Sequence, residues 1–168
     1  MSGIIEATNL KVDSLQGKTT GTNRYVVQVQ STMITGTVTH DQTSVKDITG
    51  LNVDITPQST SNKVLVTACI GSCGADGNRD LVFNIVRDST SIAIGDTGTW
   101  KASFVIRASS EVSGGHSFTV LDSPATTSSV NYKVTVQQSG SGNLKVGGRY
   151  SDTAFATPST ITVMEIAQ

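Results

Sequence analysis

The sequence predicts an all-β protein: an antiparallel jelly-roll sandwich preceded by a short extended N-terminal arm. From residue 24 onward, short segments alternate apolar and polar residues, and Gly, Asn, Asp and Ser separate one segment from the next. No stretch of ten or more residues carries the i, i+3, i+4 apolar spacing of a globular helix. We therefore divide the 168 residues into an arm and linker, 1–23, and a β domain, 24–168.

The predicted strands recur at regular intervals with turn signals between them. They are residues 25–30, 33–39, 44–48, 51–55, 63–70, 81–87, 91–94, 101–107, 116–121, 130–137, 144–150 and 160–166. Gly36 interrupts the second and indicates a bulge or a close approach of two backbones. This spacing favours a jelly roll of eight to ten strands. An immunoglobulin-like sandwich is the alternative, but it typically has about seven strands and often a Cys–Trp–Cys pattern.

Alternation within these segments predicts which residues form the core. In 63–70, Val64, Val66, Ala68 and Ile70 share one face, and Leu65, Thr67 and Cys69 share the other. Residues 81–87 and 91–94, joined by the turn 88–90, form the clearest hairpin. The aromatic residues predicted to lie in the core are Phe83, Phe104, Phe118 and Tyr132.

Composition excludes several classes of function. Charged residues make up only 15% of the chain, the net charge is −1 and the basic residues are scattered, unlike the basic surface of a nucleic-acid-binding protein. Ser and Thr supply roughly a quarter of the chain, which favours strands with polar, weakly charged outer faces. No apolar run approaches the about 18–20 residues that cross a bilayer, and the N-terminus lacks a signal-peptide pattern. We expect synthesis in a cytoplasm and no membrane insertion.

The sequence predicts no catalytic, cofactor-binding or metal-binding residues, and we expect that the protein is not an enzyme. It contains no nucleophile elbow, zinc-protease helix, P-loop or EF-hand motif. His116 and Asp122 flank one strand and could join a serine, but no nucleophile motif accompanies them. Asp76 and Asp80 could offer oxygen ligands to Ca²⁺, although Asp in a Gly-rich turn is more often a turn former.

Two cysteines, Cys69 and Cys73, lie close together in the sequence. The only histidines, His40 and His116, are too distant in sequence to complete a zinc motif. A disulfide across so short a loop would be geometrically tight. The favoured interpretation is that Cys69 is a small inward-facing residue on a strand and that Cys73 lies in the following turn.

Two aromatic residues are candidates for surface recognition. Trp100 follows the loop GDTGT and either stacks on a sugar or a protein partner or covers the end of the sandwich. Tyr150 follows two glycines at a predicted strand end and could pack at a subunit contact. The loops 71–78 and 110–115 are further candidate contacts.

The N-terminal arm carries more aliphatic residues than a disordered tail usually does. These residues are Ile4, Ile5, Leu10, Val12 and Leu15. Residues 16–23 form a Gly- and Thr-containing linker with no large apolar side chain. A disordered tail is one interpretation; the favoured one is a docking arm that becomes ordered on a partner, by strand addition or by self-association.

Several segments resemble fibre and decoration proteins of tailed bacteriophages, especially marine and cyanobacterial ones. They are TPQSTSNKVLVTACI, FNIVRDSTSIAIGD, SFTVLDSPATTSSVNYKVTVQ and TPSTITVMEI, and the arm segment LKVDSLQGKTTG is similar to the attachment segments of such proteins. The resemblance implies a domain like the trimeric jelly roll of the complement C1q and tumour necrosis factor superfamily. The long repetitive shaft of an extended fibre is missing, which favours a compact knob or head decoration.

The resemblance therefore implies a virion structural protein on the particle surface. Its expected partners are two further copies of itself, in a homotrimer, and a major capsid protein or a tail or fibre-base protein bound through the arm. The alternative is a receptor-binding, carbohydrate-binding module of a tail fibre tip that attaches to a host-surface glycan.

Overall fold

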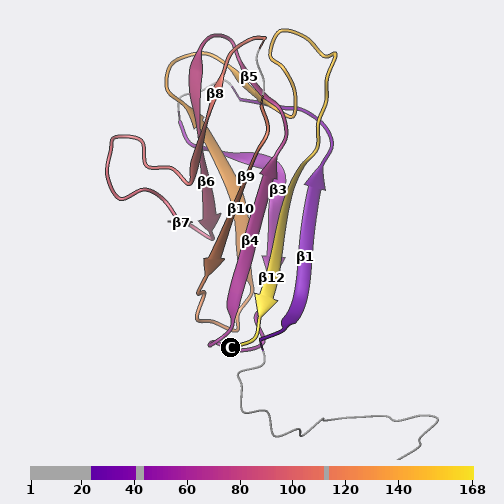
Figure 1. The fold of residues 1–168 in the computed structure, drawn as a ribbon, viewed down its shortest axis with the longest axis vertical. Coiled ribbons are helices and arrows are strands. Elements are labelled where there is room, and N and C mark those ends of the chain that lie inside the picture. The colour runs from indigo at the N-terminus through magenta and orange to yellow at the C-terminus, as the bar shows by residue number, and fades with distance from the viewer. Residues whose placement is uncertain (1–23, 41–43, 112–113) are drawn as a thin grey trace, which may run out of the picture.

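The computed structural model describes residues 24–40, 44–111 and 114–168, and every regular element in them is a β-strand (Figure 1). The strands are β1 (Val26–Ile34), β2 (Val38–His40), β3 (Lys46–Ile55), β4 (Lys63–Ile70), β5 (Cys73–Ala75), β6 (Arg79–Arg87), β7 (Thr90–Ile92), β8 (Phe104–Ala108), β9 (His116–Asp122), β10 (Val130–Gln138), β11 (Leu144–Val146) and β12 (Ser159–Ile166). The all-β prediction is confirmed. The boundary predicted after residue 23 stays a prediction, because residues 1–23 lie outside the described residues.

Two main sheets pack face to face. One has the order β1-β12-β4-β9; the other has the order β3-β10-β6-β7, with β8 also pairing with β6. A small third sheet, β2-β11-β5, lies at the end where β5 is labelled in Figure 1. All strand pairs among the described residues are antiparallel. The chain crosses repeatedly from one main sheet to the other, and neighbouring strands are mostly distant in sequence, as in the predicted jelly roll.

Side-chain alternation explains why these segments form a sandwich. Along β4 and β12 every second residue is buried, so one face of the four-stranded sheet lies on the core and the other faces outward. The predicted aromatic core is confirmed: Phe83, Phe104 and Tyr132 are buried, and Phe118 packs against them. The rings of Phe83 and Phe104 stack with centroids 4.8 Å apart. Each such buried ring stabilises the fold by roughly 1.5–3 kcal/mol.

A partly buried polar cluster joins the two main sheets. Arg87 of β6 donates to both carboxylate oxygens of Asp122 of β9, at 2.9 and 2.7 Å, and the hydroxyl of Tyr132 of β10 donates to the same carboxylate at 2.7 Å. Burial and the neighbouring carboxylate raise the pKa of the Tyr132 phenol, so it stays a hydrogen-bond donor. The cluster therefore fixes how β9 sits over β6 and β10.

A second cluster closes the base of the sandwich, where the described chain begins and ends. Glu165 of β12 is fully buried; its carboxylate accepts hydrogen bonds from the side chains of Gln28 and Asn62, both at 2.6 Å, and from the backbone N–H of Gln58 at 2.7 Å. Burial by itself would raise the pKa of Glu165, but these donors outweigh it and hold the pKa below its ordinary value. The backbone N–H of Ala167 donates to the carbonyl oxygen of Tyr25, so the first described residues lie beside the C-terminal ones.

Some predicted strand boundaries are wrong. The segment 33–39 is split, because β1 ends at Ile34 and β2 begins after a bend that contains Gly36. The segments 44–48 and 51–55 are one strand, β3, with a bulge around Gly50, whose φ is +79°. The strand predicted over 144–150 ends at Val146, since Gly147 follows with a φ of +88°. The three-residue strand β5 is too short to give an alternation signal.

Candidate functional site

The described residues do not assemble the serine-type constellation considered from the sequence. His116 and Asp122 are the first and last residues of β9, roughly 20 Å apart along an extended strand. The His116 ring stacks on Phe104, with centroids 4.9 Å apart, and the Asp122 carboxylate is held by Arg87 and Tyr132. Both side chains therefore have structural partners, and neither is positioned to act on the other.

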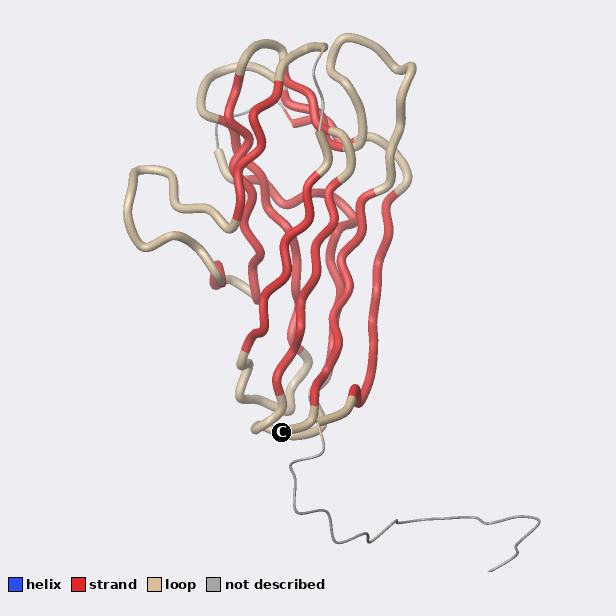
Figure 2. The backbone as a smooth tube through the Cα atoms, viewed as in Figure 1, coloured by secondary structure: helices blue, strands red, loops and turns tan. Residues whose placement is uncertain are grey.

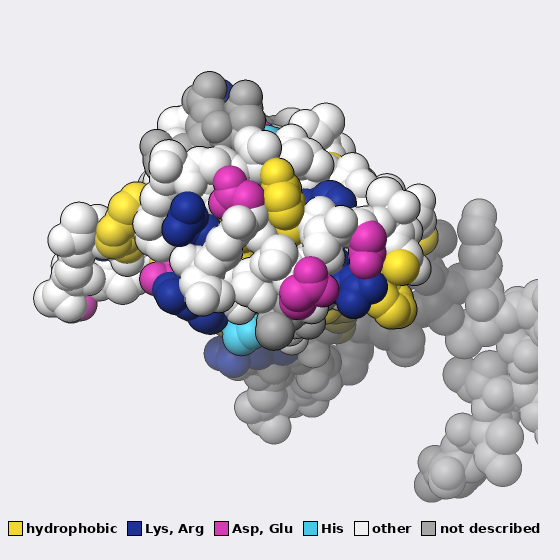
Figure 3. All heavy atoms as spheres, turned by 90° about the horizontal axis from the view of Figure 1, so that it is seen from above, with side chains coloured by type: hydrophobic (Ala, Val, Ile, Leu, Met, Phe, Trp, Pro, Cys, Tyr) yellow, Lys and Arg dark blue, Asp and Glu magenta, His cyan; other side chains and the backbone are white. Residues whose placement is uncertain are grey.

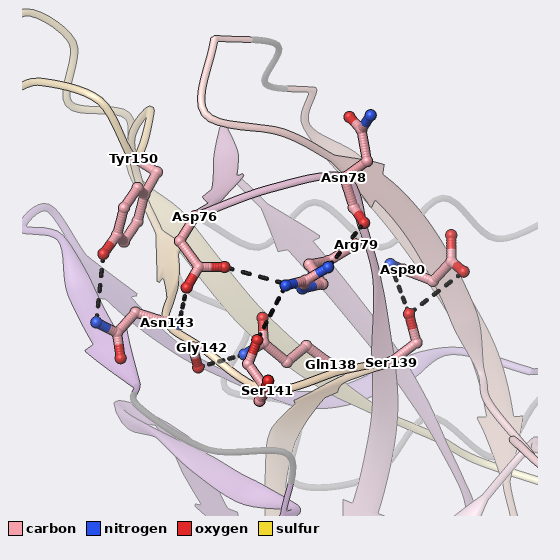
Figure 4. Close-up of polar contacts among 10 residues, drawn as sticks. All are labelled: Asp76, Asn78, Arg79, Asp80, Gln138, Ser139, Ser141, Gly142, Asn143 and Tyr150. Atoms are coloured by element: carbon pink, nitrogen blue, oxygen red, sulfur yellow. Dashed lines mark hydrogen bonds and ion pairs between the residues drawn. The ribbon is translucent and has the colours of Figure 1, made fainter.

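The carboxylates of Asp76, in the turn before β6, and of Asp80, in β6 itself, bind arginines and backbone rather than converging on one point (Figure 4). Asp76 accepts a hydrogen bond from the N–H of Asn143 at 2.9 Å, and one of its oxygens lies 3.8 Å from Nε of Arg79. Asp80 pairs instead with Arg107 at 2.8 Å. Within the described ranges, no group of three or more His, Cys, Asp or Glu could hold a metal ion. The geometry favours the turn-forming interpretation.

The two cysteines lie in environments opposite to those predicted, and the structure contains both as free thiols. Cys69 is exposed, because it shares the outward face of β4 with Leu65 and Thr67. Cys73 lies on β5 and is fully buried, and burial raises the pKa of its thiol to about 12. The prediction of an inward Cys69 and a turn Cys73 was therefore wrong; the parity of β4 already assigned Cys69 to the face opposite Val64.

Trp100 lies on a loop that projects sideways from the sandwich between β7 and β8 (Figure 2). The chain is exposed from residue 93 to residue 101, and Trp100 itself is 44% exposed. Hydrogen bonds from Gly95 N–H to the Ala102 carbonyl and from Ser103 N–H to the Phe83 carbonyl close the neck of the loop. Trp100 therefore does not cover an end of the sandwich; it is placed where a partner can reach it.

Tyr150 is half-buried rather than freely exposed. Its hydroxyl accepts a hydrogen bond from the side-chain amide of Asn143 at 3.2 Å, and the ammonium of Lys145 lies 5.9 Å from the ring centroid. Its backbone packs directly against Gly74 of β5, where a side chain would not fit. These contacts give Tyr150 a structural role at the loop end, and its predicted part in recognition stays a prediction.

The outer face of the four-stranded sheet carries an unbroken row of apolar side chains. The members of this row, directly opposite one another from strand to strand, are Val29, Met164, Leu65 and Leu121. Val29 and Leu121, on the two edge strands, are 49% and 55% exposed. Cross-strand neighbours on one face are close enough to touch, so the four side chains form a continuous apolar band across the sheet.

Hydroxyl-bearing residues form the next row of the same face. This row consists of Ser31, Thr162, Thr67 and Thr119, with hydroxyl–hydroxyl distances of 2.8 Å between Ser31 and Thr162 and 3.1 Å between Thr67 and Thr119. A third row consists of Met33, Thr160, Cys69 and Ser117. The band and these two rows are here called the assembly face.

The assembly face contrasts with the rest of the surface in its lack of charge. None of the side chains in the three rows is charged. Lys63, on the same side of β4, lies beyond the apolar band, and its ammonium donates to the hydroxyl of Ser123 at 2.6 Å. At the loop end, by comparison, positive and negative side chains are interspersed (Figure 3). Arg149, which follows β11, forms an ion pair with Asp152 at 2.6 Å. An uncharged, partly apolar sheet face that extends over four strands is typical of a protein contact surface.

The arm residues predicted to dock on a partner, Ile4, Ile5, Leu10, Val12 and Leu15, lie outside the described residues. The described chain begins at residue 24, directly after the predicted arm and linker. Tyr25 lies at the base, where its carbonyl oxygen accepts a hydrogen bond from the backbone N–H of Ala167. In the part of the chain that is described, no helix has the length and hydrophobicity needed to span a membrane.

Sequence reasoning did not find the assembly face. The alternation in β4 separated Leu65, Thr67 and Cys69 from the core positions, which was a correct signal for an outward face. It did not reveal which strands are neighbours, because β1, β12, β4 and β9 come from distant parts of the chain. A continuous row is therefore visible only once the strand order and register are known.

Comparison with known proteins gives similarities to solved structures and no family. No family model matches the chain, and neither does any curated protein sequence. Among solved structures, the chain is similar to one in the structure of infectious bursal disease virus Gx strain, with 13% sequence identity and a TM-score of 0.38. The match covers 96% of this chain and 46% of the viral chain, so this chain spans about half the length of that protein. A similarity at this level carries no conclusion about function.

Proposed function

We propose that this protein is a non-catalytic structural protein of a virus particle: a compact head-decoration or short fibre protein of a tailed bacteriophage. In this proposal three copies associate through the assembly face. The β domain projects from the particle surface, and residues 1–23 attach to a capsid or tail protein. Two observations support the proposal: the resemblance of the sequence to phage fibre and decoration proteins, and the uncharged, partly apolar outer face of the four-stranded sheet.

The assembly face is the observation that carries the proposal. A free monomer would expose the apolar band of Val29, Met164, Leu65 and Leu121 to water, with no charge among the three rows to oppose association. Four strands about 4.8 Å apart and about eight residues long give a face of roughly 20 by 25 Å. This footprint of roughly 500 Å² is somewhat over half of the about 800 Å² that each partner buries in a standard protein interface.

Trimer formation would also explain how a short arm suffices for attachment. A single segment of about twenty residues loses much of its binding energy to the entropy of ordering. Three arms carried by one trimer bind with a high effective concentration, because attachment of the first holds the others near their sites. Self-association and attachment would thus support each other.

Solution mass by light scattering tests the proposal on the full chain. We expect a particle of three times the 17.5 kDa mass of the full chain. A chain that begins at Arg24 should likewise give three times its own, smaller mass. Leu65→Lys, at the centre of the apolar band, should yield monomers, because each copy would bury an unpaired ammonium. The matched control is Gln137→Lys, an outward position on β10 in the other sheet, which should leave the trimer intact. Monomeric wild-type chain, or equal dissociation by both variants, contradicts the proposal.

Cys69 provides an independent readout from within the assembly face. In a single chain its thiol is exposed, whereas Cys73 is buried. If a trimer covers the face, a thiol reagent should modify Cys69 slowly in the wild type and quickly in Leu65→Lys. Rapid modification of Cys69 in the assembled wild type would mean that the contact uses another surface.

A receptor-binding module is the second candidate function, favoured by the exposure of Trp100 on its projecting loop. An aromatic side chain in such a position can stack on a sugar ring or enter a protein pocket. A glycan array or cell-binding assay with wild-type and Trp100→Ala protein tests it. Saturable binding that the substitution abolishes supports this function, and binding unaffected by the substitution removes Trp100 from it.

A further inference from the structure

A second feature lies on the opposite sheet, where strand β3 leaves its partner β10. Lys133 is paired with Asn52, and the ladder resumes with Thr135 opposite Asp47. Residues 48–51 of β3 therefore stand opposite a single residue of β10. Such a bulge interrupts the ladder and bends the strand, and bulges often re-aim side chains at functional sites. Here it opens a hollow on the outer face of the sheet.

The hollow is a polar pocket of about 360 Å³, at the lower end of the size range of ligand sites. It is lined by Asp47, Ile48, Thr49, Gly50, Asn52, Asn131 and Lys133. Ile48 is buried beneath it, and the other lining side chains are polar. A pocket of this volume is suited to one small ring rather than to an extended chain.

The polar groups of this pocket are only partly satisfied by one another. The Lys133 ammonium contacts one carboxylate oxygen of Asp47 at 2.8 Å, which leaves further ammonium donors and the second oxygen for a ligand. Asn131 donates to Asp54 at 2.7 Å, which leaves its amide oxygen. The side chain of Asn52 makes no hydrogen bond to any other described residue. Both hydrogen-bond donors and acceptors therefore line this one hollow.

This arrangement selects a ligand class by its charge and hydrogen bonding. An anion would meet the carboxylate of Asp47, a cation would meet the ammonium of Lys133, and an apolar ligand would leave several polar groups without partners. Adjacent hydroxyls of a sugar ring can each donate one hydrogen bond and accept others, which matches a carboxylate, amides and an ammonium side by side. We propose that the pocket at the β3 bulge binds a neutral sugar ring through its vicinal hydroxyls.

Affinity at this site should be modest, with a Kd on the order of 1 mM, because the lining offers hydrogen bonds but no aromatic platform. The pocket is on the five-stranded sheet, so the inference does not depend on whether the assembly face forms a trimer. Its residues are also distinct from Trp100. Sugar binding can therefore fail while the proposed structural role holds, and trimer formation can fail while sugar binding holds.

The experiment is an amide NMR titration of the full chain with the methyl glycosides of glucose, galactose and mannose in turn. We expect at least one of them to produce saturable shifts at Gly50, Asn52 and their neighbours. Asn52→Ala removes one ligand bond without breaking a bond within the described structure, and should raise Kd about three- to tenfold. Lys133→Met should act in the same direction. Gln137→Ala, on the same strand and face but outside the lining, should leave Kd unchanged.

Several outcomes overturn the proposal. One is the absence of saturable shifts with all three glycosides at tens of millimolar. Another is an equal Kd in wild type and Asn52→Ala, provided that the variant's spectrum is that of the folded protein. Shifts that map to the loop of Trp100 and vanish in Trp100→Ala would move sugar binding to that loop. Stronger shifts of the pocket amides with acetate or phosphate than with any glycoside would assign the pocket to an anion.

Discussion

Replacing the buried carboxylate at the base, by Glu165→Gln, should lower stability by an amount that the structure allows us to estimate. Glu165 accepts three short hydrogen bonds, two at one oxygen from Asn62 and Gln58 and one at the other from Gln28. Glutamine keeps the shape but makes two of these bonds neutral, at about 1 kcal/mol each, and turns an N–H toward the third donor, at about 1–3 kcal/mol. The neutral glutamine also avoids the free-energy cost of burying a charge, which offsets part of this loss. We therefore expect the free energy of unfolding to fall by about 2–4 kcal/mol in total.

Thermal and urea unfolding at fixed chain concentration measure this effect. For a chain of this size, about 2–4 kcal/mol corresponds to a melting temperature lower by roughly 5–15 °C. The matched control is Glu111→Gln, which removes an exposed carboxylate and should change stability by less than about 0.5 kcal/mol. A Glu165→Gln protein as stable as this control would refute the reasoning, because it would mean that the three hydrogen bonds contribute nothing beyond their neutral equivalents.

The same substitution predicts a change in pH dependence with a definite sign. The pKa of Glu165 is lower in the folded than in the unfolded chain, so its contribution is present above the unfolded value and is lost as pH falls through the folded one. The unfolded value is about 4.3. The difference in unfolding free energy between wild type and Glu165→Gln should therefore shrink as pH falls from about 5 toward 3. A difference that stays constant over this range contradicts the assigned role.

Three further predictions each depend on the surroundings of a single residue. Tyr132→Phe removes the hydroxyl that donates to Asp122 and should lower the unfolding free energy by about 1–2 kcal/mol in urea titrations. Gly142→Ala should cost about 1–3 kcal/mol in the same assay, because the residue has a φ of +117° and an added Cβ would overlap the carboxylate of Asp76. Cys73 is buried with a pKa raised to about 12, so its thiol should react with a thiol reagent only at the rate of unfolding. Reaction in native buffer without unfolding would contradict its placement.

The sequence predicts most of this fold because alternation is a local signal. Long central strands such as β4 and β10 were located to within one residue, since a buried face repeats over eight or nine positions. Errors occur where a glycine with positive φ or a bulge interrupts the pattern, as at Gly50 in β3 and Gly147 after β11. Such interruptions resemble turns in sequence, and only the pairing partner determines whether the strand continues.

The candidate surfaces were less predictable than the fold because they depend on register. The exposure of Trp100 was one of two interpretations open from its loop sequence, and the structure favours it. The apolar band and the pocket at the β3 bulge each combine residues that are close in space but distant in sequence, such as Leu65 with Leu121 and Asn52 with Lys133. Each residue alone is an ordinary exposed strand position. Only the pairing of strands shows that they act together.

The positions of the assembly face, the pocket at β3 and the loop of Trp100 predict how the proposed trimer would be oriented on a virus particle. The strands run along the long axis, and Tyr25, where the arm joins the domain, lies at the base beside the C-terminal residues (Figure 1). A threefold axis against the assembly face would run along the strands, bringing three arms to the same end and leaving the loop end pointing away. The five-stranded sheet, with the pocket at β3 and the loop of Trp100, would then face outward on every copy. Self-association and ligand contact would therefore use different sheets and need not compete.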